Sequence, residues 1–181
     1  MTIEELIRTR RSINSFKSDK PADDLILKAI DQARWAPNHQ LTEPWRFYLI
    51  GEETKQSIVE LNAKLVGEKK GPEAGQKKRK KWSQIPGWLA VTVTKSEDPL
   101  RQQEDYAACC CAIQNLALYL WKEGIGIKWT TGDIIRDQEF YDLIWVDPAI
   151  ESVVGLIWYG YPDESPVSHR KPVEEILVRL P

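Results

Sequence analysis

The sequence concentrates fixed positive charge near its N-terminus, where Arg8, Arg10 and Arg11 are followed directly by Ser12. The planar guanidinium of arginine can bind two phosphate oxygens at once, and a neighbouring serine hydroxyl adds another donor. The same arginines also stand at the expected end of a first helix, where cations interact favourably with the helix dipole. The cluster is therefore either an anion site or ordinary helix-terminal charge.

A second basic pair, Arg170 and Lys171, stands near the other end of the chain, just before Pro172. If the C-terminal segment folds back, the two basic clusters could hold one phosphate group between them. The sequence contains neither GxGxxG nor GxxxxGK[ST], so the usual glycine-rich phosphate loops are absent. A phosphate bound by this chain would therefore have to be held by side chains.

The segment RWAPNHQLTEPWRF, residues 34–47, contains His39, one of only two histidines in the chain. A lone loop histidine is either a surface or capping group or a side chain that acts at a site. No serine, cysteine or aspartate stands beside it in a triad-like arrangement, and the second histidine is not at ligand spacing. We therefore expect neither a metal site nor a nucleophilic catalytic residue.

Composition narrows the class of protein. The 181 residues are 42% hydrophobic, which is enough for one core, so we expect a single domain over residues 1–181. The net charge of −2 carries no signature of a nucleic-acid or membrane partner. No apolar run approaches the ~20 residues that cross a bilayer, and the N-terminus holds acidic residues where a signal peptide is apolar. Cys109, Cys110 and Cys111 are expected to be small core residues in a reducing cytoplasm.

Helical periodicity and capping residues predict helices at about 3–10, 22–36, 57–67, 104–124 and 135–145. Short β-prone runs, most of them bounded by glycine, predict strands at 45–51, 88–94, 126–132 and 152–162. Helices that alternate with strands predict a mixed α/β sheet covered by helices. The helix at 104–124 is apolar around most of its circumference, so we expect it to be buried on nearly all sides.

Residues 67–83, GEKKGPEAGQKKRKKWS, form the most polar stretch of the chain. One interpretation is a solvated loop followed by an exposed helix turn. The other is a mobile lid whose lysines attract an anionic substrate or a nucleotide cofactor.

Four segments, in order along the chain, resemble motifs of the nitroreductase-like flavoproteins, above all the compact YdjA-like members. RRSINSF resembles their R-R-S-x-R-x-F, and APNHQLTEPWRF resembles A-P-(S/D)-x-x-x-x-Q-P-W-x-F. GIGIKWTTG resembles G-(L/I)-G-x-x-W-x-x-G, and HRKPVEEIL resembles R-x-P-x-E-E-(I/V/L). The four matches span nearly the whole chain, so the ordered set is more specific than any single motif.

The resemblance implies an α+β nitroreductase sandwich, with a central, mainly antiparallel sheet flanked by helices, in an intertwined homodimer. It implies that FMN binds at the subunit interface and that hydride passes from NAD(P)H to the flavin and on to a small planar acceptor, such as a nitroaromatic or a quinone. Relatives of such proteins also act as oxidases, dehalogenases or flavin-modifying enzymes. The residues alone also leave open a non-enzymatic α/β binding domain.

The cofactor-binding positions of the family fall on nine residues of this chain, which are Arg10, Arg11, Ser12, Trp35, His39, Trp129, Thr130, Thr131 and Arg170. The first three match the phosphate- and ribityl-binding motif, and the last matches the C-terminal phosphate arginine. The backbone of residues 129–131 is expected to approach the flavin ring. The resemblance implies that Trp35 and His39 reach the flavin from the other subunit, with His39 as the candidate for shaping or protonating at the acceptor side.

Three positions depart from the family pattern. Asn14 stands where many members have Arg or Lys near the pyrimidine edge of the flavin, so the loss of a cation there is expected to change the redox potential. Glu43 replaces a glutamine, and its carboxylate either disfavours acidic substrates near the cofactor pocket or, as we expect, pairs with a nearby arginine. Trp35 is bulkier than the common residue at its position and would narrow the pocket. No motif separates NADH from NADPH or selects one acceptor, because a planar slot accepts many molecules.

Overall fold

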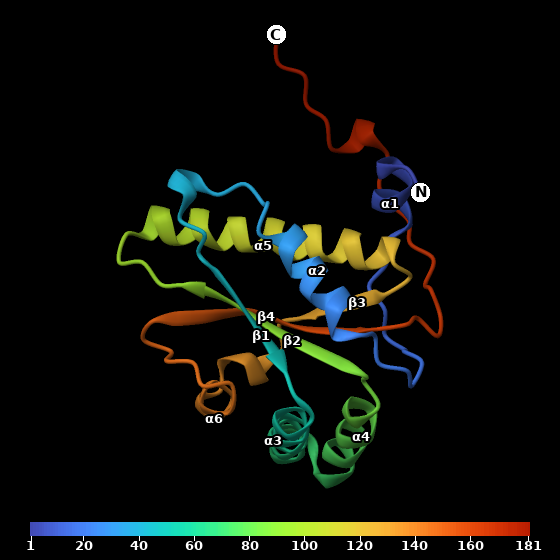
Figure 1. The fold of residues 1–181 in the computed structure, drawn as a ribbon, viewed down its shortest axis with the longest axis vertical. Helices are drawn as coiled ribbons and strands as arrows, with labels where there is room; N and C mark the ends of the chain where they lie inside the picture. Colours follow the sequence, from blue (N-terminus) through green and yellow to red (C-terminus); the bar gives the residue numbers. More distant parts are fainter.

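Four antiparallel strands form the centre of the computed structural model, which describes residues 1–181 (Figure 1). The strands are β1 (Trp45–Ile50), β2 (Gly87–Thr94), β3 (Gly126–Thr130) and β4 (Glu151–Gly160), and their order in the sheet is β1-β2-β4-β3. Every neighbouring pair is antiparallel, so β1 and β3 are the edges. The four strands predicted from the sequence are confirmed to within a few residues.

Helices cover both faces of this sheet (Figure 1). One face carries α2 (Asp23–Ala33) and the long α5 (Pro99–Lys122), and the other carries α3 (Glu52–Lys70), α4 (Pro72–Ser83) and α6 (Gln138–Leu143). The N-terminal α1 (Ile3–Thr9) lies near one end of α5. Three 3₁₀ turns complete the chain, at His39–Leu41, Asp133–Arg136 and Val173–Glu175. The expected α+β sandwich with an antiparallel sheet is confirmed.

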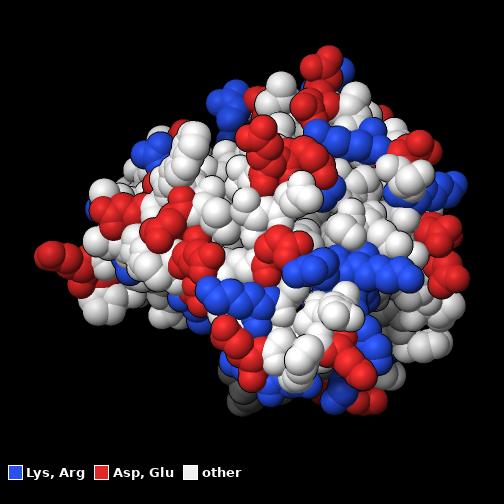
Figure 2. Space-filling view, turned by 90° about the horizontal axis from the view of Figure 1, so that it is seen from below, with Lys and Arg blue, Asp and Glu red and all other residues white.

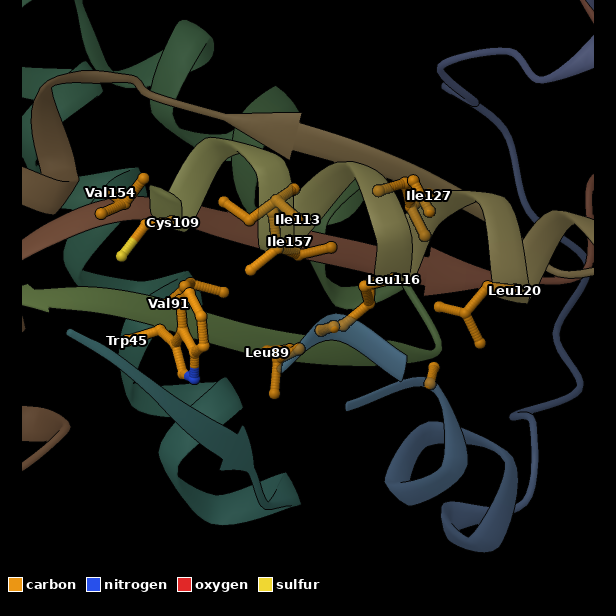
Figure 3. Close-up of a cluster of buried hydrophobic side chains, with 14 of the residues drawn as sticks. Trp45, Leu89, Val91, Cys109, Ile113, Leu116, Leu120, Ile127, Val154 and Ile157 are labelled. Carbon is orange, nitrogen blue, oxygen red and sulfur yellow. The ribbon is translucent and has the colours of Figure 1, made fainter. Parts of the chain in front are cut away.

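The two layers between sheet and helices follow from the alternation of side chains along β2. Leu89 and Val91 point toward α2 and α5, where they join Ile113 and Leu116 in the core shown in Figure 3. Trp88 and Ala90 point to the opposite face and join the second core, which lies under α3, α4 and α6. A strand with both faces buried is a nearly continuous apolar run in the sequence, and the central strands β2 and β4 have this pattern.

The second core is built around three tryptophans. The ring of Trp82 lies edge-on to the rings of Trp88 and Trp158, with centroid separations of 5.3 and 5.1 Å. Edge-to-face contacts of this kind stabilise a core by about 0.5–1.5 kcal/mol beyond the area they bury. Three of the eight tryptophans in the chain therefore have a packing role.

Residues 67–83 are helical except at Gly71, so the predicted solvated loop is wrong and the predicted exposed helix turn is instead a whole exposed helix. The lid interpretation stays a prediction. The helix α3 continues to Lys70, Gly71 turns the chain with a φ of 91°, and α4 begins at Pro72. Only Gly75 and Trp82 of α4 are buried, so its sequence shows almost no apolar stripe. The helix packs through its backbone instead, because Gly75 lies directly against α3.

Within a single chain, the helix α5 is buried on one side only, so its predicted burial on nearly all sides stays a prediction for an assembly. One side, which includes Ala112 and Leu116, is buried in the core, whereas Tyr106 and Cys111 on the opposite side are exposed. Successive residues of a helix are roughly 100° apart, so the three consecutive cysteines cannot share one environment. Only Cys109 is a core residue, and burial raises the pKa of its thiol to about 12.

The C-terminal tail, residues 161–181, leaves the body of the molecule past the N-terminal helix (Figure 1). Its apolar side chains are exposed, and they are Val167, Val173, Ile176, Leu177, Val178 and Leu180. The chain contains no helix with both the length and the apolar character of a membrane span. It also contains no group of three or more His, Cys, Asp and Glu side chains arranged to hold a metal ion.

The close approach of α3 and α4 gives a stability prediction. A methyl group at Gly75 would lie 2.5 Å from the carbonyl oxygen of Ala63, so Gly75→Ala should lower the free energy of unfolding by about 1–3 kcal/mol. The matched control is Gly67→Ala on α3, whose methyl group would have no neighbour closer than 4.0 Å. That variant should be neutral or stabilised by up to about 1 kcal/mol. Urea unfolding followed by circular dichroism measures both, and equal midpoints would contradict the packing described here.

Candidate functional site

Basic side chains from the two ends of the chain meet beside the edge strand β3. The segment after α1 pairs with this strand, because the Ile13 amide donates to the carbonyl of Ile127 at 2.9 Å and Ser12 forms a parallel bridge with the same residue. The returning C-terminal tail is tied to it by Arg11, whose Nε donates to the Pro166 carbonyl at 3.1 Å. The structure therefore brings Arg170 into the neighbourhood of Arg10.

The arginines of this cluster lack negative partners. Burial lowers the pKa of Arg10, and the charges of Arg11 and Arg170 lower it further. None of the three forms an ion pair with a carboxylate, although most other arginines of the chain do. Arg11 donates instead to backbone carbonyls, and Arg170 to Ser168 and the carbonyl of His169. Mutual repulsion of this kind favours binding of an anion.

A cleft of about 750 Å³ opens beside the same strand, between β3, α3, α4 and the turn at residues 133–136. Trp129, Thr130 and Thr131 line it, which are three of the residues that the sequence had pointed to. The Trp129 indole donates to the Val154 carbonyl at 3.1 Å, and the Thr130 hydroxyl donates to the Leu156 carbonyl at 2.8 Å. Their side chains are therefore fixed against β4, which holds the backbone of this segment in place.

The walls of the cleft are positively charged. Its lining contains the cations Lys69, Lys70, Lys78, Lys128 and Arg136, against the two carboxylates of Asp133 and Asp137. One of these carboxylates is already paired, because Lys69 Nζ lies 2.6 Å from Asp133 Oδ2. On the face that carries α3, α4 and α6, acidic and basic side chains are otherwise interspersed (Figure 2). The excess of cations in the cleft favours an anionic ligand.

Lys128 has the most unusual surroundings of these cations. Its Nζ donates to Asn14 Oδ1 at 2.6 Å and lies 5.2 Å from the ring centroid of Trp158. The pKa of Lys128 is lowered, first by burial and then by the charges of Lys81 and Lys78. No carboxylate forms an ion pair with it, so the ammonium is half-buried without a counter-ion.

Asn62 of α3 adds an unsatisfied donor to the cleft wall. The residue is 7% exposed, and its Nδ2 has no hydrogen-bond partner in the chain. The indole Nε1 of Trp158, which also lines the cleft, is likewise buried without a partner. Buried donors of this kind each cost about 1–3 kcal/mol. Trp88 Nε1 and Tyr159 OH are buried without a partner too, but only the donors of Asn62 and Trp158 belong to residues that line the cleft, where a ligand with acceptor atoms could bind them.

Trp35 and His39 lie elsewhere. Neither lines the cleft, and both are exposed, with Trp35 at 73%. His39 borders a separate hollow that also involves Asp98, Arg101 and Asp105. Within one chain, the structure therefore does not bring these two residues to the arginines or to the cleft.

The loop that carries His39 has an unusual backbone. Gln40, Leu41 and Glu43 have φ values of 53°, 52° and 41°, a left-handed conformation that non-glycine residues seldom adopt. The loop is held by Thr42, whose hydroxyl donates to the buried Asp105 at 2.6 Å. Glu43 makes no ion pair, so the expectation that it pairs with an arginine is wrong; its amide donates to Asn38 Oδ1 at 2.9 Å.

Comparisons with known proteins agree with this geometry. The sequence pattern of the Nitroreductase family matches residues 7–161. The putative NAD(P)H nitroreductase YfhC of Bacillus subtilis is 33% identical over 178 residues, covering 96% of this chain and 91% of YfhC. The putative NAD(P)H nitroreductase YdjA of Escherichia coli is more distant, at 23% identity over 164 residues and 87% of each chain.

Two solved structures have the same fold. A nitroreductase-like family protein from Bacillus cereus superposes with a TM-score of 0.87 at 29% identity, covering 99% of this chain and 96% of the other. A putative nitroreductase from Desulfovibrio desulfuricans, solved in complex with FMN, superposes with a TM-score of 0.79 at 22% identity, covering 98% and 96%. This chain thus has the nitroreductase fold, in which an antiparallel sheet lies between two helical layers. The basic cluster and the cleft lie along one edge strand of that sheet. The chain belongs to the nitroreductase family, as its four sequence motifs had indicated.

The unpaired amide in the cleft gives a second stability prediction. Replacing Asn62 by leucine, which has a similar shape, removes the unsatisfied donor and should raise the free energy of unfolding of the ligand-free protein by about 1–3 kcal/mol. The control, Gln76→Leu on the exposed side of α4, should leave the urea midpoint unchanged. A lower midpoint for Asn62→Leu would mean that the amide is satisfied and has a structural role.

Proposed function

We propose that this chain is an FMN-dependent oxidoreductase that uses NAD(P)H to reduce a small planar acceptor, such as a nitroaromatic or a quinone. The observation that carries the proposal is the meeting of uncompensated cations from both chain ends beside a cleft on one edge strand. The FMN bound to the Desulfovibrio protein of the same fold, and the name of YfhC, support this assignment.

The residues present fit FMN in chemistry and in layout. Arg10, Arg11, Ser12 and Arg170 would supply charged and hydroxyl donors to the phosphate. Ser12 pairs with Ile127, and Thr131 is four residues further along the chain, a span of about 13 Å at the rise of a strand. The arginine cluster that would bind the phosphate therefore lies near the start of β3, and the cleft that would hold the flavin ring lies near its end. The unpaired donors of the cleft match the carbonyl and nitrogen acceptors on the pyrimidine side of a flavin.

FMN held by these residues would supply the two-electron redox chemistry between NAD(P)H and the acceptor. The contribution of the protein is to bind and to orient. The fixed backbone of residues 129–131 would support the ring, and the basic walls of the cleft would attract the anionic dinucleotide. His39 is the proposed residue for shaping or protonating at the acceptor side.

A second copy of the chain would complete the molecule. The exposed side of α5, with Tyr106 and Cys111, and the apolar tail have nothing to cover them in a single chain. Trp35 and His39 are exposed and lie away from the cleft of their own chain, as expected if they serve the site of a partner. We therefore propose an intertwined homodimer. The three free thiols support its placement in the reducing cytoplasm.

Cofactor binding can be tested with a pair of ligands that differ only in the phosphate. Arg10→Gln and Arg170→Gln should each weaken FMN binding by about 10- to 100-fold, since a hydrogen bond to a charged group contributes about 1.5–3 kcal/mol. Riboflavin, which lacks the phosphate, should bind both variants and the parent protein alike. Lys77→Gln, an exposed lysine of α4 outside the cleft, is the control.

Quenching of flavin fluorescence measures these affinities, and addition of NADH or NADPH under argon tests whether the bound flavin is bleached. A protein that takes up no FMN would refute the proposed function. If the protein binds FMN but NADH and NADPH do not bleach the flavin, the protein is an FMN protein that catalyses a different redox reaction.

The homodimer can be tested through the tail. Ile176→Asp with Val178→Asp places charges on side chains that are exposed in a single chain, so a monomer would tolerate them. In a dimer that buries the tail, the charges would weaken association strongly. Light scattering during gel filtration should show a dimer for the parent and for the control Arg179→Gln, and a shift to monomer for the double variant. A parent protein that is monomeric would contradict the assembly.

A further inference from the structure

We propose that Lys128 supplies the positive charge that stabilises the reduced form of the cofactor, and that Asn14 is the residue that positions it. This inference rests on the proposed function, because it concerns the same cleft. It assigns a specific task to one lysine among the several that line the cleft.

The first argument is the absence of a counter-ion. Lys55, Lys64 and Lys69 each lie within hydrogen-bonding distance of a carboxylate, whereas the half-buried Lys128 forms no ion pair. Its neighbours Lys78 and Lys81 are also cations, and they lower its pKa in addition to the effect of burial. A cation desolvated among other cations is costly unless an anion joins it. The open side of Lys128 is the cleft, so the missing negative charge belongs to the ligand.

The second argument is the fixed direction of the ammonium group. An ammonium group has three donors, and Asn14 Oδ1 accepts one of them at 2.6 Å. The face of Trp158 lies on another side of the group, with its ring centroid 5.2 Å from Nζ. Asn14 follows directly after Ile13, which is fully buried and paired with β3, so the amide that holds the lysine is itself held. The remaining donors are left for the cleft that the residue lines.

The third argument concerns the neutral residue at position 14. The loss of a cation there was expected to change the redox potential, but the structure places a cation in contact with Asn14. In this chain the cation stands on the adjacent strand, and the asparagine accepts its hydrogen bond. A positive charge therefore lies beside position 14 although that residue is neutral.

A purely structural lysine would behave differently. A cation over an aromatic ring contributes about 0.5–1 kcal/mol at an exposed site, and this contribution does not depend on the redox state of a ligand. A charge that serves the reduced cofactor must favour the reduced form over the oxidised form. The two roles are distinguished by measuring both states.

The test is the two-electron midpoint potential of the FMN-loaded protein, measured by equilibration with a reference dye, together with the dissociation constant of oxidised FMN. Lys128→Gln should weaken binding of reduced FMN about tenfold relative to oxidised FMN, which corresponds to a potential about 30 mV more negative. Lys77→Gln, the matched control, should leave the potential unchanged. Lys128→Arg, which keeps the charge, should retain most of the parent potential.

A residue exchange provides the second test. The double variant with Asn14→Lys and Lys128→Asn returns the cation to the N-terminal segment and should restore the parent potential. A Lys128→Gln protein with the potential of the Lys77→Gln control would overturn the proposal. The proposal would also be overturned if Lys128→Gln weakened the binding of oxidised and reduced FMN equally, because Lys128 would then contact the cofactor without favouring its reduced form. Failure of the parent protein to bind FMN would instead refute the proposed function itself.

Discussion

The pairing of residues 12 and 13 with the edge strand β3 is the interaction on which the site depends. Ile13 is fully buried against Gly126, where a Cβ atom would lie 2.3 Å from the Ile13 side chain, so only glycine permits this approach. The pairing fixes the basic cluster on one side and Asn14 on the other. Because the cleft opens along the same strand, a single short stretch of sheet aligns everything that the proposed cofactor would need.

The charge distribution follows from this alignment. Elsewhere on the surface, cations such as Lys64 on α3 and Arg79 on α4 are paired with carboxylates. Lys128 on β3 and the arginine cluster beside it have no such pair, although the whole chain is slightly acidic. Arg10 and Lys128 are half-buried without a carboxylate partner, which costs stability in the empty site and favours an anion there. In the same way, the side-chain amide of Asn62 has no hydrogen-bond partner in the empty cleft, which costs stability until an acceptor binds it.

The sequence predicted the strands well, because buried β-prone runs such as 88–94 carry their own signal. It failed on the extent of α4, whose packing surface is a glycine backbone and one tryptophan. The apolar composition of α5 did not indicate which side of the helix a single chain leaves uncovered. Sequence motifs pointed to Arg10 and residues 129–131 as candidate site residues, because each motif lies within one short continuous segment of the chain. Lys128 and Asn62 could not be found, since they come together only where β3, α3 and the N-terminal segment meet. The one available signal was a lysine between Ile127 and Trp129 in an otherwise apolar strand.

The strained loop at residues 40–43 is held in place independently of the basic cluster and the cleft along β3. Left-handed non-glycine residues cost of the order of 1–3 kcal/mol each, and here the strain is held by Thr42 through the interior carboxylate of Asp105. The clamp originates on α5, whereas the basic cluster and the cleft belong to β3 and the opposite helical layer. Substitutions around Asp105 can therefore reshape the surroundings of His39 without disturbing the arginines or the cleft of the same chain. During evolution, the loop around His39 can thus vary independently of the cations along β3.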